Sequence, residues 1–391
     1  MFDITKIARP NILTLEPYRC ARDDFQEGVL LDANENTYGP SFNCSKDLNR
    51  YPDPHLVPLK QRLCDFRNGE RATDQPLKPS NICLSVGSDG GIDMLIRCFV
   101  KPSVEKVLVC PPTYPMYDTC CSVNDVEMVE EPLDLENFQI RPKAILRRLS
   151  EDHSIKLVFI TSPGNPTGTK IKEELIMEVI EGVERMSWNG LIVVDEAYID
   201  FCPEGSSFAV FVNKHKNLVV LQTFSKSFAL AGIRLGISYS ADEVSNLLNI
   251  ARDPYSTNRE TATAAMGATS KKAIDLMKLK CRKVNEQKKI VLERLKGIKG
   301  VRNIGGMDGN FILIQILNDE GEPDGKRAYE IYWKMATERK VVVRYRGGEM
   351  GCEGCLRVTI GRSEENERLV GELKELVSGP RSQKCREGEP F

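Results

Sequence analysis

The apolar residues of this chain gather in short, often β-branched runs, separated by longer stretches with helical spacing. Such runs predict buried strands. They stand at residues 82–86, 106–110, 157–161, 191–194 and 218–221. Apolar residues recur with a helical period at 56–66, 92–99 and 173–184. Strands that alternate with helices in this way form a mostly parallel sheet with right-handed crossovers, so the pattern predicts an α/β fold.

From about residue 240 the pattern changes to long, charged helical stretches. Helices are predicted over 242–252 and 260–295, and Pro254 separates them, because proline disfavours helix at the preceding residue. Strands at 301–317 and 341–346, a helix at 327–339 and a terminal helix at 364–377 indicate a second, smaller domain. We expect an N-terminal arm with the start of the small domain (1–45), a large domain (46–270), a small C-terminal domain (271–378) and a disordered tail (379–391).

The composition is that of an ordinary globular protein, since 41% of the residues are hydrophobic and 28% are charged. A formal net charge of −2 gives no reason to expect a nucleic-acid or membrane partner. No apolar run approaches the roughly 20 residues that span a bilayer. The first residues are typical of neither a signal peptide nor a transit peptide. We therefore expect a cytoplasmic protein.

The 13 cysteines are scattered, mostly in apolar runs, which is typical of reduced thiols in a chain without a secretion signal. Cys352 and Cys355 form a CxxC pair. A metal site needs a second such pair or histidines at ligand spacing, and His55, His153 and His215 are isolated from each other. We interpret the pair as a turn with two incidental thiols, with a redox pair as the alternative, and we expect no metal.

A polar side chain follows each predicted strand at its carboxyl end. These side chains are Ser88, Tyr114, Asn165, Asp195 and Lys226. In open α/β sheets, ligands bind at the edge where the strands have their carboxyl ends. We therefore expect the five residues to converge on a single site.

The stretch around Lys226 indicates what this site binds. The hydroxyls of Thr223 and Ser225 precede the lysine, and Arg234 follows it. Burial and a neighbouring cation lower a lysine's pKa, which makes the amine a nucleophile. Arginine and hydroxyl groups suit a phosphate, and so do the backbone N–H groups of the Gly-rich turn at 87–91, which opens a helix. The pattern suits a Schiff-base lysine that carries pyridoxal 5′-phosphate.

The other strand-end residues match the needs of that cofactor. Its ring is an electron sink only while the ring nitrogen stays protonated, which requires a buried carboxylate such as Asp195. Asn165 and Tyr198 are placed to hydrogen-bond the ring hydroxylate, and Tyr114 to stack on the ring. Lys226 is then expected to act as the general base that moves the substrate's proton.

These residues lie in motifs that resemble fold-type I pyridoxal-phosphate aminotransferases, and more narrowly the histidinol-phosphate aminotransferase family of the fungal type. The motifs are residues 31–36, 50–54, 111–114, 162–168, 195–198, 225–227 and 351–357. The arm motif at 15–18 and the stretch at 351–357 narrow the resemblance to this branch. It covers about residues 5–375 and implies a large domain with a mostly parallel seven-stranded sheet, a smaller α+β domain and an N-terminal arm.

The resemblance also implies a homodimer with shared active sites. The cofactor would be held by the residues discussed above together with Ser88, Asp89 and Gly90, and by Tyr51 from the partner subunit. The substrate's phosphate would be bound by Arg357, with Arg344, Tyr18 and Asn34 nearby and Tyr255 from the partner. The implied reaction converts histidinol phosphate and 2-oxoglutarate to imidazole acetol phosphate and glutamate, in histidine biosynthesis. One anion site would serve both substrates.

Some positions depart from the family's pattern. They are Thr37, Gly90, Asp253, Ser256 and Arg362. These changes leave the cofactor chemistry intact, since Gly90 would contribute only a backbone donor, but they weaken the substrate assignment. The alternative is therefore a diverged paralogue, or another fold-type I enzyme, that acts on a different amino acid or a secondary-metabolite intermediate. A non-catalytic binding protein is disfavoured, because it has no reason to keep the whole set of cofactor residues. A dehydrogenase is disfavoured as well, because the turn at Gly87 lacks the dinucleotide glycine spacing.

Overall fold

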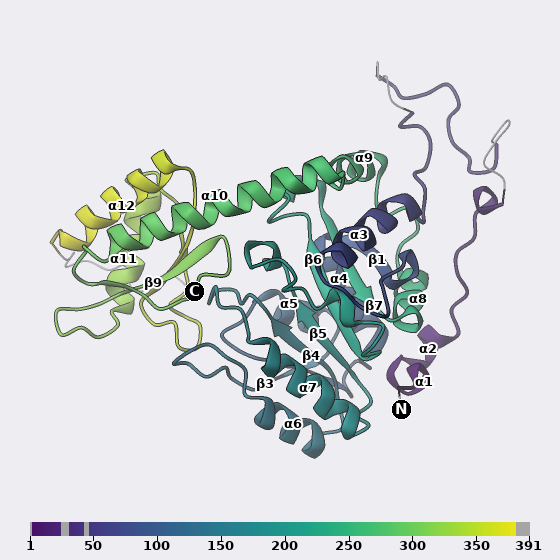
Figure 1. Cartoon of the computed structure of the whole chain (residues 1–391), viewed down its shortest axis with the longest axis horizontal. Helices are drawn as coiled ribbons and strands as arrows, with labels where there is room; N and C mark the ends of the chain where they lie inside the picture. Colours follow the sequence, from purple (N-terminus) through teal and green to yellow (C-terminus); the bar gives the residue numbers. More distant parts are fainter. Residues whose placement is uncertain (1, 25–30, 43–46, 381–391) are drawn as a thin grey trace.

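A computed structural model describes residues 2–24, 31–42 and 47–380 (Figure 1). The predicted disordered tail lies outside the described residues from position 381 onward. Among the residues described, no helix is both long and apolar enough to cross a membrane.

A seven-stranded sheet forms the centre of the larger part of the molecule. Its strands are β1 (Ile82–Val86), β2 (Lys106–Val109), β3 (Glu127–Glu130), β4 (Ile155–Thr161), β5 (Leu191–Asp195), β6 (Leu218–Thr223) and β7 (Leu235–Ser240). They are arranged in the order β1-β7-β6-β5-β4-β2-β3. Neighbours from β3 to β6 are parallel, and β7 runs antiparallel to both β6 and β1. The mostly parallel α/β sheet is therefore confirmed.

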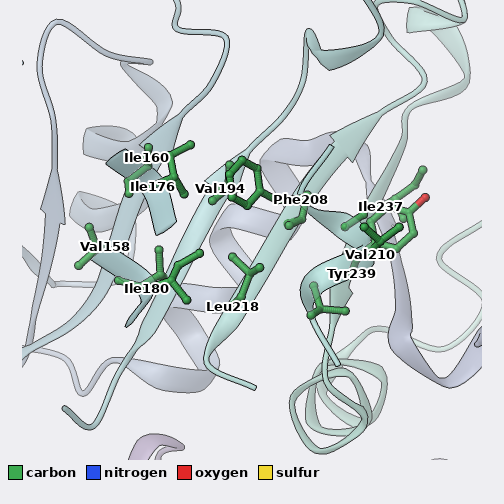
Figure 2. Close-up of a cluster of buried hydrophobic side chains, with 14 of the residues drawn as sticks. Val158, Ile160, Ile176, Ile180, Val194, Phe208, Val210, Leu218, Ile237 and Tyr239 are labelled. Atoms are coloured by element: carbon green, nitrogen blue, oxygen red, sulfur yellow. The ribbon is translucent and has the colours of Figure 1, made fainter. Parts of the chain in front are cut away.

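Helices cover both faces of this sheet. They are α3 (Val57–Glu70), α4 (Gly87–Phe99), α5 (Met116–Val123), α6 (Pro142–Glu151), α7 (Glu173–Arg185) and α8 (Asp242–Ala251). One face packs Val194 and Leu218 against Ile176 and Ile180 of α7 (Figure 2). The opposite face packs Val193 with α4, α5 and α8. Burial on both faces explains why the strands are continuous apolar runs.

The N-terminal residues lie against the second of these faces. Two short helices, α1 (Ile4–Ile7) and α2 (Pro10–Leu13), bury Ile7 and Ile12 in the same apolar cluster as α4 and α8. Short 3-10 turns occur at Ala21–Asp23, Pro79–Asn81, Ile199–Phe201, Ala209–Phe211 and Ala231–Ile233.

A second, antiparallel sheet is formed by the C-terminal part. Its strands are β8 (Val301–Asn303), β9 (Phe311–Ile316), β10 (Arg344–Tyr345) and β11 (Cys355–Thr359), in the order β10-β11-β9-β8. The helices α11 (Gly325–Thr337) and α12 (Ser363–Ser378) pack on it around Ile314, Ile331 and Leu369. The predicted strand at 301–317 is thus two strands, because glycines at 305, 306 and 309 interrupt it.

The helix predicted over 260–295 is also two helices, α9 (Arg259–Ala268) and α10 (Lys271–Leu295). They part at Ser270, whose side chain caps α10 by accepting a hydrogen bond from the Ala273 backbone N–H. Serine is favoured at this N-cap position and disfavoured in a helix interior, because its hydroxyl can bond the free backbone N–H groups of the first turn. Figure 1 shows α10 reaching from α9 to α11 and α12, so it links the two sheets. The exact domain boundaries stay a prediction.

Candidate active site

Lys226 stands just beyond β6, between the two sheets. Its amine is partly buried, and Nζ lies 5.4 Å from the centroid of the Tyr198 ring. Burial and, next in size, the Arg357 guanidinium lower the pKa of this amine from its usual value. A larger fraction of the amine is therefore uncharged near neutral pH than for a lysine in water, as a nucleophile or a base requires.

A group of hydrogen-bond donors lies near Lys226. Thr223 Oγ1 donates to Ser225 Oγ at 3.0 Å, and Arg234 Nη1 donates to the same oxygen at 3.4 Å. The first turn of α4, which contains Ser88 and Gly90, starts at Gly87 directly after β1. We call Thr223, Ser225, Arg234 and this first turn the phosphate cradle, because hydroxyls, a guanidinium and helix N-terminal N–H groups are the donors that bind phosphate.

Gly87 shows how closely this cradle is packed. Its φ is +68°, and a Cβ at this position would lie 2.5 Å from Arg234 Nη2. Only glycine allows the guanidinium to approach the start of the helix in this way. Arg234 itself has a left-handed backbone with φ 52°.

Asp89 and Tyr114 border the cradle. The Tyr114 hydroxyl donates to Asp89 Oδ1 at 3.0 Å, and Asp89 Oδ2 lies 3.5 Å from Arg234 Nη2. Burial and the Asp89 charge raise the pKa of Tyr114. The phenol therefore stays protonated and can donate to Asp89.

Asp195 ends β5 and is buried. It accepts hydrogen bonds from the Tyr117 hydroxyl at 2.7 Å and the Ala197 N–H at 3.2 Å. Burial raises the pKa of Asp195 to about 6. Tyr117, stacked on Phe159, also lies 2.9 Å from Thr161 Oγ1 through its hydroxyl. The sequence reasoning did not select Tyr117, and its place three residues after Tyr114 was the only signal.

The strand β11 of the smaller sheet brings Arg357 to the site. Its Nη1 donates to Asn165 Oδ1 at 2.5 Å, and its guanidinium lies 5.5 Å from the centroid of the Phe311 ring. Tyr198 contacts Phe311 edge-on, with the ring centroids 5.1 Å apart. Asn165 and Tyr198 follow strands of the larger sheet, whereas Phe311 and Arg357 belong to the smaller one. The site therefore lies between the sheets.

Arg346 is a second arginine near Arg357 that the sequence reasoning missed. The Arg346 backbone N–H donates to the Cys355 carbonyl at 2.9 Å, and its Nη1 donates to Glu349 Oε1 at 2.6 Å. Its charge is, after burial, the next cause that lowers the pKa of Arg357. Arg344, the predicted residue, pairs with Arg357 across the strand ladder but has an exposed side chain.

Three of the predicted residues lie together elsewhere. The Tyr255 ring contacts those of Tyr18 and Tyr51, with centroids 6.0 Å and 4.7 Å away. Asn34 lines a surface pocket with Tyr51. In the described part of a single chain, the ring contacts of these tyrosines are with one another rather than with Lys226 or Arg357.

The donor set fits pyridoxal 5′-phosphate. The phosphate cradle offers hydroxyls and a guanidinium, Asp195 offers a buried carboxylate for a ring nitrogen, and Lys226 offers an amine of lowered pKa for the aldehyde. Over the described residues, no group of three His, Cys, Asp or Glu side chains is arranged to hold a metal ion. Cys352 and Cys355 are free, buried thiols.

Comparison with known proteins agrees with this chemistry. Residues 21–373 match the family described as Aminotransferase class I and II. A histidinol-phosphate aminotransferase of Candida maltosa is 49% identical over 97% of this chain and 99% of that protein. The Saccharomyces cerevisiae protein with the same name is 47% identical over 96% of this chain and 98% of that protein.

The solved structures extend the agreement to the fold. The histidinol-phosphate aminotransferase of Sinorhizobium meliloti in complex with pyridoxal-5′-phosphate superposes with a TM-score of 0.73, covering 88% of this chain and 89% of that chain at 21% identity. At this identity the likeness concerns the fold. The resemblance found in the sequence motifs is confirmed by the relatives of high identity. The chain belongs to the class I and II aminotransferases and, within them, to the histidinol-phosphate aminotransferases.

Proposed function

We propose that this protein transfers the amino group of histidinol phosphate to 2-oxoglutarate, with pyridoxal 5′-phosphate as cofactor, in histidine biosynthesis. The observation that carries the proposal is the pairing of a phosphate cradle with a second cation, Arg357, since the charges of Arg234 and Arg357 both act on Lys226. Two anion sites suit a phosphorylated cofactor and a phosphorylated substrate. The relatives of 46–49% identity that bear this name support the same choice.

We assign the cofactor's phosphate to the phosphate cradle and its ring nitrogen to Asp195. When bound, the cofactor supplies a protonated pyridine ring that draws electrons from the carbon that carries the substrate's amino group. Asp195, which Tyr117 orients by its hydrogen bond, would keep the proton on the ring nitrogen. Asn165 and Tyr198 would bind the ring hydroxyl, and Tyr114 would cover the ring.

Lys226 is the covalent attachment point and the proton carrier. Its lowered pKa supports this assignment, because the neutral amine can take the proton from the substrate's amino-bearing carbon. Once protonated, the same Nζ can give the proton up again, so that Lys226 acts first as a base and then as an acid.

Arg357 is the proposed ligand of the substrate's phosphate and of the carboxylate of 2-oxoglutarate. Its planar fork suits both anions. Arg346 is a candidate second ligand, and Arg344 lies two residues before it, on β10. Tyr18 and Asn34 stay predicted ligands, although within the described part of one chain they lie with Tyr255 and Tyr51. We further propose a homodimer in which Tyr51 and Tyr255 of each subunit serve the partner's site. This arrangement explains why these tyrosines lie away from Lys226 of their own chain.

A spectral titration tests the proposal. Histidinol phosphate is added to the cofactor-loaded enzyme without a keto acid, and the cofactor's absorbance is followed. We expect conversion to the amino form of the cofactor at micromolar donor, and regeneration on adding 2-oxoglutarate. The Lys226→Ala variant serves as the control and should complete no catalytic cycle. A loaded wild-type enzyme that responds to another amino donor but not to histidinol phosphate would identify a diverged paralogue.

A further inference from the structure

Behind the site lies a buried network of polar side chains that none of the proposed catalytic roles uses. We propose that Arg67 and Asp200 are positioning residues, which fix the backbone at Lys226 and at Asp195 relative to each other through this network. The inference rests on the proposed function insofar as it takes Lys226 and Asp195 to be the cofactor's residues.

The first half of the network starts beside the lysine. Ser227 follows Lys226 directly, and its Oγ donates to Asp200 Oδ2 at 2.6 Å. The other carboxylate oxygen of Asp200 accepts from Arg67 Nη1 at 2.8 Å. A charged acceptor makes the serine's hydrogen bond stronger than a bond between neutral groups. The residue after the lysine is thus anchored to α3.

The second half of the network leads from Arg67 to the end of β5, where Asp195 stands. Arg67 Nε and Nη2 donate to Gln222 Oε1 at 3.0 Å and 2.7 Å. Gln222 Nε2 in turn donates to Glu196 Oε2 at 2.8 Å. Glu196 is fixed further by the Ser207 hydroxyl and the Phe208 N–H, each at 2.6 Å. The network therefore ends on the residue that follows Asp195.

The positions of these residues follow one rule. Ser227, Gln222 and Glu196 are each the immediate sequence neighbour of a residue assigned to the cofactor, namely Lys226, Thr223 and Asp195. Gln222 and Thr223 are neighbours on β6, where successive side chains point to opposite faces of the sheet. Ser227 lies in the turn after β6 and reaches the network through Asp200, and Glu196, which directly follows β5, reaches it through Gln222. One guanidinium is joined to both strand ends.

The charge of this network is not explained by stability alone. The Arg67 side chain is only 3% exposed, and it pairs with Glu70 as well as with Asp200. Well-packed apolar side chains often stabilise a core at least as well as buried ion pairs do. A guanidinium also donates several hydrogen bonds in fixed directions. Arg67 can therefore hold groups that follow two different strands in a fixed arrangement, which a site built from both strands requires.

The test removes the hydroxyl next to the lysine. In Ser227→Ala, we expect kcat to fall by about tenfold, as for the loss of one charge-assisted hydrogen bond, with KM for histidinol phosphate changed by less than about twofold. The cofactor should also leave the variant faster on dialysis. Ser227→Thr keeps the hydroxyl and should restore both properties. Ser245→Ala is the matched control, because it also removes a buried hydroxyl, one on α8 that accepts from Asn249 and takes no part in this network.

A double variant separates positioning from general loss of stability. Because Ser227 acts through Asp200, Ser227→Ala should slow Asp200→Asn no further, whereas independent effects would multiply. Multiplying effects, or a Ser227→Ala enzyme that behaves like the Ser245→Ala control, would overturn the proposal. Cofactor loss is measured without any substrate, so this readout stays valid even if the amino donor proves to be a different one.

Discussion

At the scale of single residues, the environment of Asp195 separates it from an ordinary surface carboxylate. Burial raises its pKa from 3.8 to about 6 before any cofactor is considered. A buried carboxylate of this kind needs a positive partner to remain ionised at neutral pH. A protonated pyridine nitrogen is such a partner, and we therefore expect the site to bind the charged ring more tightly than a neutral one.

The raised pKa has a consequence for the protein without cofactor. The folded state binds the Asp195 proton more tightly than the unfolded state, so this group's contribution to stability is present below pH 3.8 and is lost as the pH rises through about 6. Asp195→Asn removes this loss and still accepts from Tyr117. Cofactor-free Asp195→Asn should therefore exceed the cofactor-free parent in stability by roughly 3 kcal/mol at pH 8, and by much less at pH 4.

Denaturant unfolding of the two cofactor-free proteins across this pH range measures the difference. Glu196, whose pKa burial raises to about 7, contributes to both proteins and cancels. An advantage that does not change with pH would contradict the assignment. In the loaded enzyme the order should reverse, because asparagine cannot hold the ring nitrogen's proton.

At the scale of elements, the junction of β1 and α4 is the best place to test the phosphate cradle. In Gly87→Ala, the new Cβ meets Arg234 Nη2 at 2.5 Å and the backbone keeps a φ of +68°, which strains any other residue. We expect the affinity for pyridoxal 5′-phosphate to fall about tenfold or more, given a backbone strain of about 1–2 kcal/mol and a displaced guanidinium. Equilibrium titration of the cofactor-free protein measures this affinity.

Gly90→Ala provides the matched control in the same turn. A Cβ at Gly90 would make only ordinary contacts, the nearest being Ser85 Cβ at 3.6 Å. Cofactor affinity should stay within about twofold of that of the parent, because alanine has a higher helix propensity than glycine and fits at this position. Equal losses in the two variants would show that the turn tolerates no side chain at all, and would refute the specific role of the Arg234 approach.

The elements also show what the sequence allowed us to predict. The five strands with continuous apolar runs were identified, because burial on both faces leaves a clear pattern. β3 and β7 were missed. β3 lies at the edge of the sheet and is half polar, and β7 mixes serine and glycine with its apolar residues. Strand ends placed Asp195 and Lys226 correctly at one edge of the sheet. Tyr117 and Arg346 were not predicted, because their roles depend on partners distant in sequence or on a ladder register that no local pattern encodes.

At the scale of the whole molecule, Arg357 connects the two sheets through its hydrogen bond to Asn165. Arg357→Ala should raise KM for histidinol phosphate and for 2-oxoglutarate together, each by about tenfold or more, because one guanidinium is proposed to bind both anions. Steady-state kinetics with each substrate varied in turn measures the two values. Arg302→Ala is a suitable control, as Arg302 lies on β8 of the same sheet and pairs with Gln315. A rise for only one substrate would show that the anions bind separately.

The long helix α10 is one of the connections on which the placement of Arg357 relative to the larger sheet depends. At 1.5 Å per residue, the 25 residues of α10 form a helix about 37 Å long. A rotation of about 2° at the α9 end would swing the other end by about 1 Å, enough to break a hydrogen bond at the site. Asn285, near the middle of α10, donates a hydrogen bond to the Phe201 carbonyl at 2.8 Å. This bond holds the middle of the helix against the larger part of the molecule and so reduces the length of helix that can move. We therefore expect Asn285 to help fix the position of Arg357, the proposed substrate ligand, together with the backbone hydrogen bonds from Gly306 to Thr167 and from Asp308 to Gly168 that also join the two parts.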